Sequence, residues 1–148
     1  AAFQEFGQAI AIDSGYAPAR LNQGSVLLKA GDFEGAAAEY RAVLEKDSDH
    51  VAARIALGVA LRGMGDHQKA KRQYERVLKQ QPSNADALFN LGVLRAEFLD
   101  QRPESRELFQ RFLDVAPSDH PKRERATRYL DEIPAPSPPS GQQQGGQG

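Results

Sequence analysis

The hydrophobic positions in the middle of the chain follow helical spacing in two runs. From Ile55 to Leu61, apolar and small side chains recur three and four residues apart, as on one face of an α-helix. A glycine-containing stretch that ends at Asp66 interrupts this spacing. The spacing then resumes from Ala70 to Leu78, before a Gln-Pro boundary. The pattern predicts two helices joined by a tight turn.

This two-helix pattern recurs along the chain with a period of 34 residues. Six columns of identical or similar residues share the offset. They are Gly24, Gly58 and Gly92; Ala19, Ala53 and Ala87; Asp32, Asp66 and Asp100; Ala2, Ala36 and Ala70; Phe6, Tyr40, Tyr74 and, one residue late, Phe109; and Ile10, Leu44, Leu78 and, one residue late, Leu113. The sequence therefore predicts an array of similar helical hairpins, each with its apolar side buried against its neighbours.

These columns resemble the tetratricopeptide repeat (TPR) family, which has a small residue in its first helix, a glycine-acid turn, and an alanine and an aromatic residue in its second helix. The resemblance covers 17–50, 51–84 and 85–119 as three TPR units. Ser48 replaces the closing proline of the first unit, and the turn before Pro103 loses its glycine and gains one residue. The resemblance implies an all-α fold, a right-handed α-solenoid of TPR helix-turn-helix repeats.

Both ends of the array depart from a complete unit. Residues 1–16 match the second helix of a preceding repeat that is truncated, with Asp13 and the serine after it at the closing turn, so we expect a fragment with an apolar N-terminal face. Residues 120–133 carry apolar positions at helical spacing and predict a C-terminal capping helix, which an array needs to close its last apolar face. Residues 134–148, rich in proline, glutamine and glycine and without charge, predict a disordered tail.

Composition and motifs exclude several classes of function. The formal net charge of −1 gives no bulk attraction to nucleic acid or anionic lipid, and the absence of cysteine excludes disulfides and thiolate chemistry. His50, His67 and His120 fall in three different turns, which disfavours a metal site. Phosphate-binding glycine loops and nucleophile motifs are absent from the sequence. We therefore expect no enzyme activity, no cofactor and no metal.

A basic cluster lies in the predicted capping helix. It comprises Lys122, Arg123, Arg125 and Arg128. We interpret it as the solvated face of that helix, because nucleic-acid interfaces normally interleave basic and aromatic residues and Tyr129 is expected to be buried. RNA binding through the cluster is the alternative interpretation.

The resemblance also implies a concave groove, lined by the first helices of successive units. Its expected lining is Leu21, Asn22, Ser25, Lys29, Ile55, Val59, Arg62, Asp86, Phe89, Asn90, Val93 and Glu97. Apolar members of this set predict a protein or peptide partner with apolar anchors, with Phe89 as a contact whose loss weakens binding and leaves helicity intact. Asn22 and Asn90 could clamp the partner's backbone or, alternatively, satisfy neighbouring helix ends. Members of the family that bind chaperone tails hold a terminal carboxylate with Lys and Arg; here uncharged or acidic residues, Ile55 and Asp86 among them, stand at several of those positions, which disfavours that mode.

The sequence thus predicts a non-catalytic protein–protein interaction scaffold within a bacterial multiprotein assembly. Arginine-rich, alanine-rich composition and the Gln/Gly tail are similar to those of TPR scaffolds in bacterial envelope and gliding-motility assemblies, which favours a bacterial cytoplasm or envelope (periplasm). Two alternatives stay open. The N-terminal helix could drive homo-oligomeric assembly through the face around Phe3 and Phe6. The chain could also be an accessory subunit of an enzyme or of a secretion or motility complex.

Overall fold

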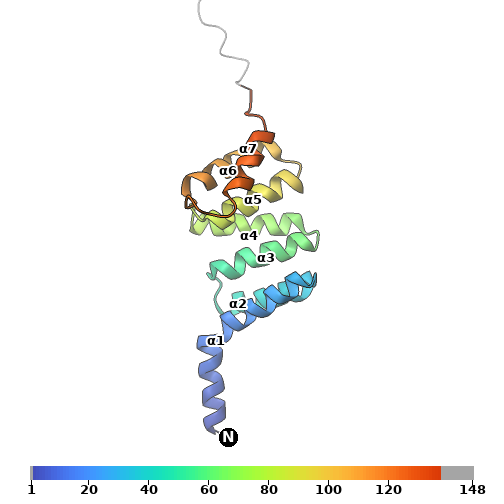
Figure 1. The fold of residues 1–148 in the computed structure, drawn as a ribbon. Coiled ribbons are helices and arrows are strands. Elements are labelled where there is room, and N and C mark those ends of the chain that lie inside the picture. Colours follow the sequence, from blue (N-terminus) through green and yellow to red (C-terminus); the bar gives the residue numbers. More distant parts are fainter. Residues whose placement is uncertain (1, 138–148) are drawn as a thin grey trace, which may run out of the picture.

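The computed structural model describes residues 2–137, with side chains from residue 15 onward, and within that part of the chain every regular element is an α-helix. The helices are α1 (Ala2–Lys29), α2 (Phe33–Lys46), α3 (Val51–Gly63), α4 (His67–Gln80), α5 (Ala85–Glu97), α6 (Arg102–Val115) and α7 (Arg123–Glu132). They stack one after another along the chain (Figure 1). The all-α prediction is confirmed. None of the described helices combines the length and apolar character that crossing a bilayer requires.

Each hairpin is closed by a glycine of its first helix that faces an aromatic ring of its second. A Cβ atom on Gly58 would overlap the ring of Tyr74, and one on Gly92 would lie 2.8 Å from Cε1 of Phe109. Gly24 faces the Tyr40 ring in the same way. Because these glycines lack a side chain, the paired helices approach closely enough to enclose the ring.

Each turn inside a hairpin contains one residue with a left-handed backbone conformation. That residue is a glycine in two turns and an aspartate in the third. Gly31 and Gly65 have φ of 82° and 84° in the first two turns. In the third turn, after the one-residue insertion, Asp100 takes this conformation with φ of 52°. Aspartate tolerates the left-handed region better than most residues with a side chain. The turn therefore survives the loss of its glycine.

Side chains at the helix starts satisfy backbone N–H groups that the helices leave open. Gly35 N donates to Asp32 Oδ1 at 2.9 Å, and Ala87 N donates to Asn84 Oδ1 at 2.9 Å. Arg54, which is almost buried, donates from Nη1 to Gln73 Oε1 and from Nη2 to Ser48 O, tying α3 to α4 and to the preceding turn. Burial lowers the pKa of this guanidinium.

The N-terminal prediction differs from the structure. Residues 1–16 are expected to form a separate helix that ends at Asp13, yet α1 continues through that position to Lys29. The first half of α1 therefore does not fold back as a separate helix. Instead it projects away from the stack, and α1 changes direction partway along (Figure 1). Pro18 lies inside α1 and cannot donate a backbone hydrogen bond, which gives a physical reason for the bend. The side chains of Phe3 and Phe6 lie outside the described ones.

The capping helix α7 is fixed by arginines that bind the exposed carbonyls of helix ends. Arg123 Nη1 donates to the carbonyls of Leu113 and Ala116, at the end of α6, at 2.8 and 2.9 Å. Arg106 of α6 donates to Leu130 O and Ile133 O at the end of α7. The two arginines thus satisfy C-terminal carbonyls of both helices. The predicted tail has no regular structure over 134–137 and otherwise lies outside the described residues.

Tyr74 carries a buried hydroxyl with no hydrogen-bond partner among the described residues. Phe109 holds the equivalent place in the third hairpin without a hydroxyl. We predict that Tyr74→Phe raises the free energy of unfolding by about 1 kcal/mol, because it removes an unsatisfied polar group and keeps the ring. Urea unfolding measures this change, with Tyr40→Phe as the matched variant in the first hairpin.

A second measurement separates this cause from a general packing effect. Burial raises the pKa of Tyr74, so the folded state keeps the proton where the unfolded state loses it, near pH 10. The stability of the parent protein should therefore fall as the pH rises past about 10. Tyr74→Phe should lose less stability over that range; an equal loss, or a variant less stable at neutral pH, would contradict the assignment.

Candidate functional site

A hollow of about 420 Å³ opens between α3, α5 and the start of α7. We call it the α3–α5 groove. Its lining residues are Ile55, Val59 and Arg62 of α3; Asp86, Phe89, Asn90 and Val93 of α5; and Lys122 and Arg125 at the start of α7. The α3 and α5 members all belong to the set expected from the sequence. Lys122 and Arg125, which belong to the basic cluster of the capping helix, lie outside that set.

The remaining expected groove residues lie elsewhere. Leu21 of α1 is half-buried and packs against the core, whereas Asn22, Ser25 and Lys29 are exposed and do not line the α3–α5 groove. Glu97 lines a smaller hollow of about 220 Å³, with Arg125, Arg128, Tyr129 and Glu132. The structure therefore gathers the α3 and α5 members around one hollow and leaves the α1 members outside it.

Phe89 is a core residue rather than an accessible anchor. Its side chain is 2% exposed, and its ring lies 5.8 Å from the ring of Phe109 and 5.3 Å from that of Phe112, measured between centroids. On the groove side, Lys122 Nζ and Arg125 Cζ lie 5.1 and 5.2 Å from the Phe89 centroid. Because Phe89 is buried beneath Lys122 and Arg125, its removal should cost stability as well as any contact that it makes in the groove.

Asn90 is nearly buried in the wall of the groove. Its Nδ2 donates to the backbone oxygen of Asp86 at 2.8 Å, one turn earlier in the same helix. Among the described residues its Oδ1 accepts no hydrogen bond. One of its two N–H donors thus serves α5 itself. The side-chain oxygen is the part that a ligand backbone could use.

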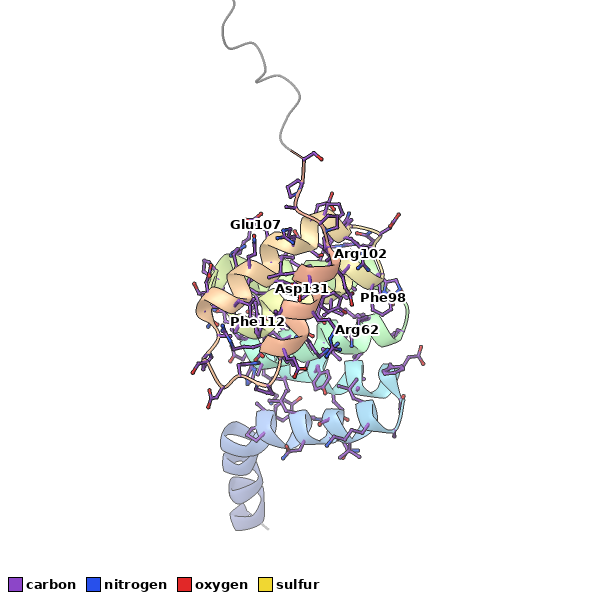
Figure 2. All side chains as sticks on the ribbon, turned by 45° about the horizontal axis from the view of Figure 1, so that its top comes forward. Arg62, Phe98, Arg102, Glu107, Phe112 and Asp131 are labelled. Atoms are coloured by element: carbon purple, nitrogen blue, oxygen red, sulfur yellow. The ribbon has the colours of Figure 1, made fainter. Side chains whose placement is uncertain are left out.

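Positive charge dominates the groove. Arg62, Lys122 and Arg125 contribute three cations against the single carboxylate of Asp86, and none of the three forms an ion pair with a carboxylate of the described chain. Arg62 also lies over the ring of Phe98, 5.7 Å from its centroid, and Figure 2 shows the two side chains next to each other. Arginine and lysine on aromatic rings are held in place while their N–H groups still point to solvent or ligand.

The basic cluster of α7 is only partly the solvated face that the sequence suggested. Arg123 is half-buried and bonded to carbonyls of α6, and Lys122 and Arg125 face Phe89. Arg128 is exposed and pairs with Glu124 at 3.5 Å. The cluster thus holds the capping helix in place and charges the groove.

The titratable residues show structural roles in the described part of the chain. His50 Nδ1 accepts from Ala53 N at 3.1 Å, His120 Nδ1 accepts from Lys122 N at 3.1 Å, and His67 stacks on Phe98. The side chains from residue 15 to 137 contain no cluster of metal-binding residues. Burial, together with the charge of Glu97, raises the pKa of Tyr129.

Two family models, each described as tetratricopeptide repeat, match the chain over residues 27–88 and 86–119. Together they span more than half of it. The chain belongs to the tetratricopeptide repeat family. The TPR prediction made from the 34-residue columns is confirmed. The bacterial envelope and gliding-motility resemblance stays a prediction, and no curated protein matches the chain significantly.

Solved structures share the TPR fold at low sequence identity. The first TPR of Spaghetti (RPAP3), bound to an HSP90 peptide, has a TM-score of 0.72 at 19% identity and covers 81% of this chain and 94% of its own. The second TPR domain of human RPAP3, in complex with an HSP70 peptide, has a TM-score of 0.67 at 20% identity, covering 79% and 93%. The type III secretion chaperone SycD of Yersinia enterocolitica, in complex with a peptide of the translocator YopD, has a TM-score of 0.73 at 15% identity, covering 81% and 93%. At this identity the likeness supports the fold.

The burial of Phe89 leads to a test. We predict that Phe89→Ala lowers the free energy of unfolding by about 3 kcal/mol. The substitution leaves a cavity under α7 and removes the ring that Lys122 and Arg125 cover. Phe98→Ala, at a ring that is 45% exposed, should cost less than about 1 kcal/mol. Chemical denaturation of both variants makes the comparison. Equal losses would show that α7 does not cover Phe89 in solution.

Proposed function

We propose that this TPR protein is a non-catalytic protein–protein interaction scaffold that binds a segment of its partner in the α3–α5 groove. Membership of the family supports this, as do structural neighbours that hold an HSP90 peptide, an HSP70 peptide and a peptide of the translocator YopD. A hollow of about 420 Å³ has room for a few side chains of an extended or helical segment.

The single observation that carries the proposal further is a set of three cations that form no ion pair with a carboxylate in the described part of the chain. Arg62, Lys122 and Arg125 flank a wall on which Ile55 and Val59 are half-buried and so partly accessible. Placing an acidic side chain there gains charge-assisted hydrogen bonds, and placing an aliphatic one against the α3 wall removes apolar surface from water. We infer an acidic partner segment with an aliphatic anchor.

We expect the partner to bind differently from the chaperone tails of the family, whose terminal carboxylate is held by Lys and Arg. Asp86 and Ile55 stand at groove positions where chaperone-binding members of the family carry cations, and both line the α3–α5 groove. A carboxylate beside Asp86 would be repelled. We therefore expect the acidic groups of the partner to contact Arg62, Lys122 and Arg125 rather than Asp86.

The biological setting is proposed on composition alone. The Arg- and Ala-rich chain and its Gln/Gly tail support a bacterial multiprotein assembly, in which this protein is a scaffold or an accessory subunit of an enzyme or of a secretion or motility complex.

Panning a random peptide display library against the protein tests the chemistry of the ligand directly. Selected peptides should be enriched in Asp and Glu next to Leu, Ile or Val. Arg62→Glu should weaken the binding of a selected peptide about tenfold at low salt, with a smaller difference at high salt, because a charge pair near the surface is screened. Titration followed by fluorescence anisotropy gives both values.

Arg72→Glu is the matched control, because Arg72 is an exposed arginine of α4 outside the groove lining. It makes the same change in net charge and should leave the affinity within about twofold, since long-range effects are largely screened. Enrichment of basic peptides, or an equal loss of affinity in the two variants, would show that the peptide does not bind in the α3–α5 groove as proposed.

A further inference from the structure

The packing between successive TPR units uses the same face of each first helix. On α3 and α5 this face consists of residues that are at most 4% exposed. They are Ala53, Leu57 and Ala60 of α3, and Ala87, Leu91 and Leu94 of α5. The second helix of the preceding unit packs on each of these helices, α2 on α3 and α4 on α5. Burial of this face is therefore what joins one unit to the next.

The equivalent face of α1 is uncovered. One period earlier in the sequence stand Ala19, Gln23 and Val26, and all three are exposed. Val26 is 61% exposed, whereas its counterparts Ala60 and Leu94 are fully buried. We call these three residues the α1 outer face. No described element packs on it in place of a preceding second helix.

The segment that fits this face lies in the same chain. Residues 2–13 repeat the pattern of α2 one period earlier, with Phe6 in the column of Tyr40 and Ile10 in the column of Leu44. Asp13 and the serine after it likewise precede by one period the Asp47-Ser48 turn that leads from α2 to α3. By sequence, residues 2–13 are the second helix that should cover the α1 outer face.

Within one molecule they do not reach it. Because α1 is continuous from Ala2 to Lys29, residues 2–13 extend beyond the α1 outer face instead of folding back on it (Figure 1). A single helix of about this length is only marginally stable by itself in water. Among the described residues, the α1 outer face is thus left without the second helix that covers the equivalent faces of α3 and α5.

We propose that two copies of the chain exchange these segments. Residues 2–13 of each copy pack antiparallel on the α1 outer face of the other, in the place that α2 takes on α3. A reciprocal exchange of this kind is isologous, so each copy gives and receives the same contact. The middle of α1 then lies on the twofold axis. Gly15 stands there, and a Cβ on it would meet nothing within 4 Å, so the position is open to a neighbouring chain.

The mass in solution of the full chain, measured by light scattering as the concentration is raised, tests the exchange. It should rise from that of one chain to twice that value. Val26→Glu should hold the protein at the mass of one chain throughout, because it places a charge in the shared apolar contact. Ser25→Glu is the matched control, since Ser25 is the exposed neighbour of Val26 outside the α1 outer face, and it should dimerise like the parent. By circular dichroism, Ser25→Glu should keep the helicity of the parent, and Val26→Glu should lose at most the helicity of residues 2–13.

A cysteine at the axis distinguishes exchange from any other dimer. The chain has no cysteine, so Gly15→Cys introduces a single thiol that the exchange brings next to its copy. Under mild oxidation it should form a disulfide-linked dimer much faster than Ser118→Cys, a variant at an exposed loop position after α6. A mass of one chain at all concentrations would show residues 2–13 folded back or unpaired and would overturn the proposal. Dimers insensitive to Val26→Glu, or equal oxidation of the two cysteine variants, would also overturn it.

Discussion

The close approach of two helices at a glycine is the contact on which the rest of this molecule depends. Gly58 lets α3 and α4 enclose the ring of Tyr74, and the same arrangement recurs at Gly24 and Gly92. The enclosed ring fixes the distance and angle within each hairpin, because a ring cannot be compressed and a Cβ cannot be added without displacing it. Once the geometry within each hairpin is fixed, only the stacking of one hairpin on the next can vary. The face that α3 and α5 turn toward the groove follows from that stacking.

Most of the fold could be predicted because its determinants are local and repeat. The column of glycines, the column of aromatic residues and the residues that begin the helices act within one hairpin, so the period reveals them. Even the irregular third turn obeys this logic, since Asp100 adopts the left-handed backbone that Gly31 and Gly65 adopt in the first two. The seven groove residues of α3 and α5 could be predicted for the same reason. They lie at fixed positions of the first helices, and the repeat identifies the second helix that packs on each of them.

The features that could not be predicted depend on contacts between segments that the 34-residue repeat does not relate to each other. To predict the burial of Phe89, one must know where the loop after α6 places Lys122 and Arg125. The spacing of residues in that loop does not specify those positions. The continuity of α1 past Asp13 could not be predicted either, because the period places a turn there. Asp13 is followed by a serine, as Asp47 is, yet only Asp47 ends a helix, and α2 and α3 pack on each other on either side of it.

The capping helix links the stability of the array to the charge of its groove. Arg106 and Arg123 hold α7 by binding carbonyls at two helix ends, and this docking is what places Lys122 and Arg125 over Phe89. The same cations therefore cover the core on one side and, among residues 15–137, form no ion pair with a carboxylate. Under the proposed function, a ligand that binds them would also hold α7 on the stack and so stabilise the groove and the cap together. The end that closes the hydrophobic core thus supplies two of the three cations of the α3–α5 groove.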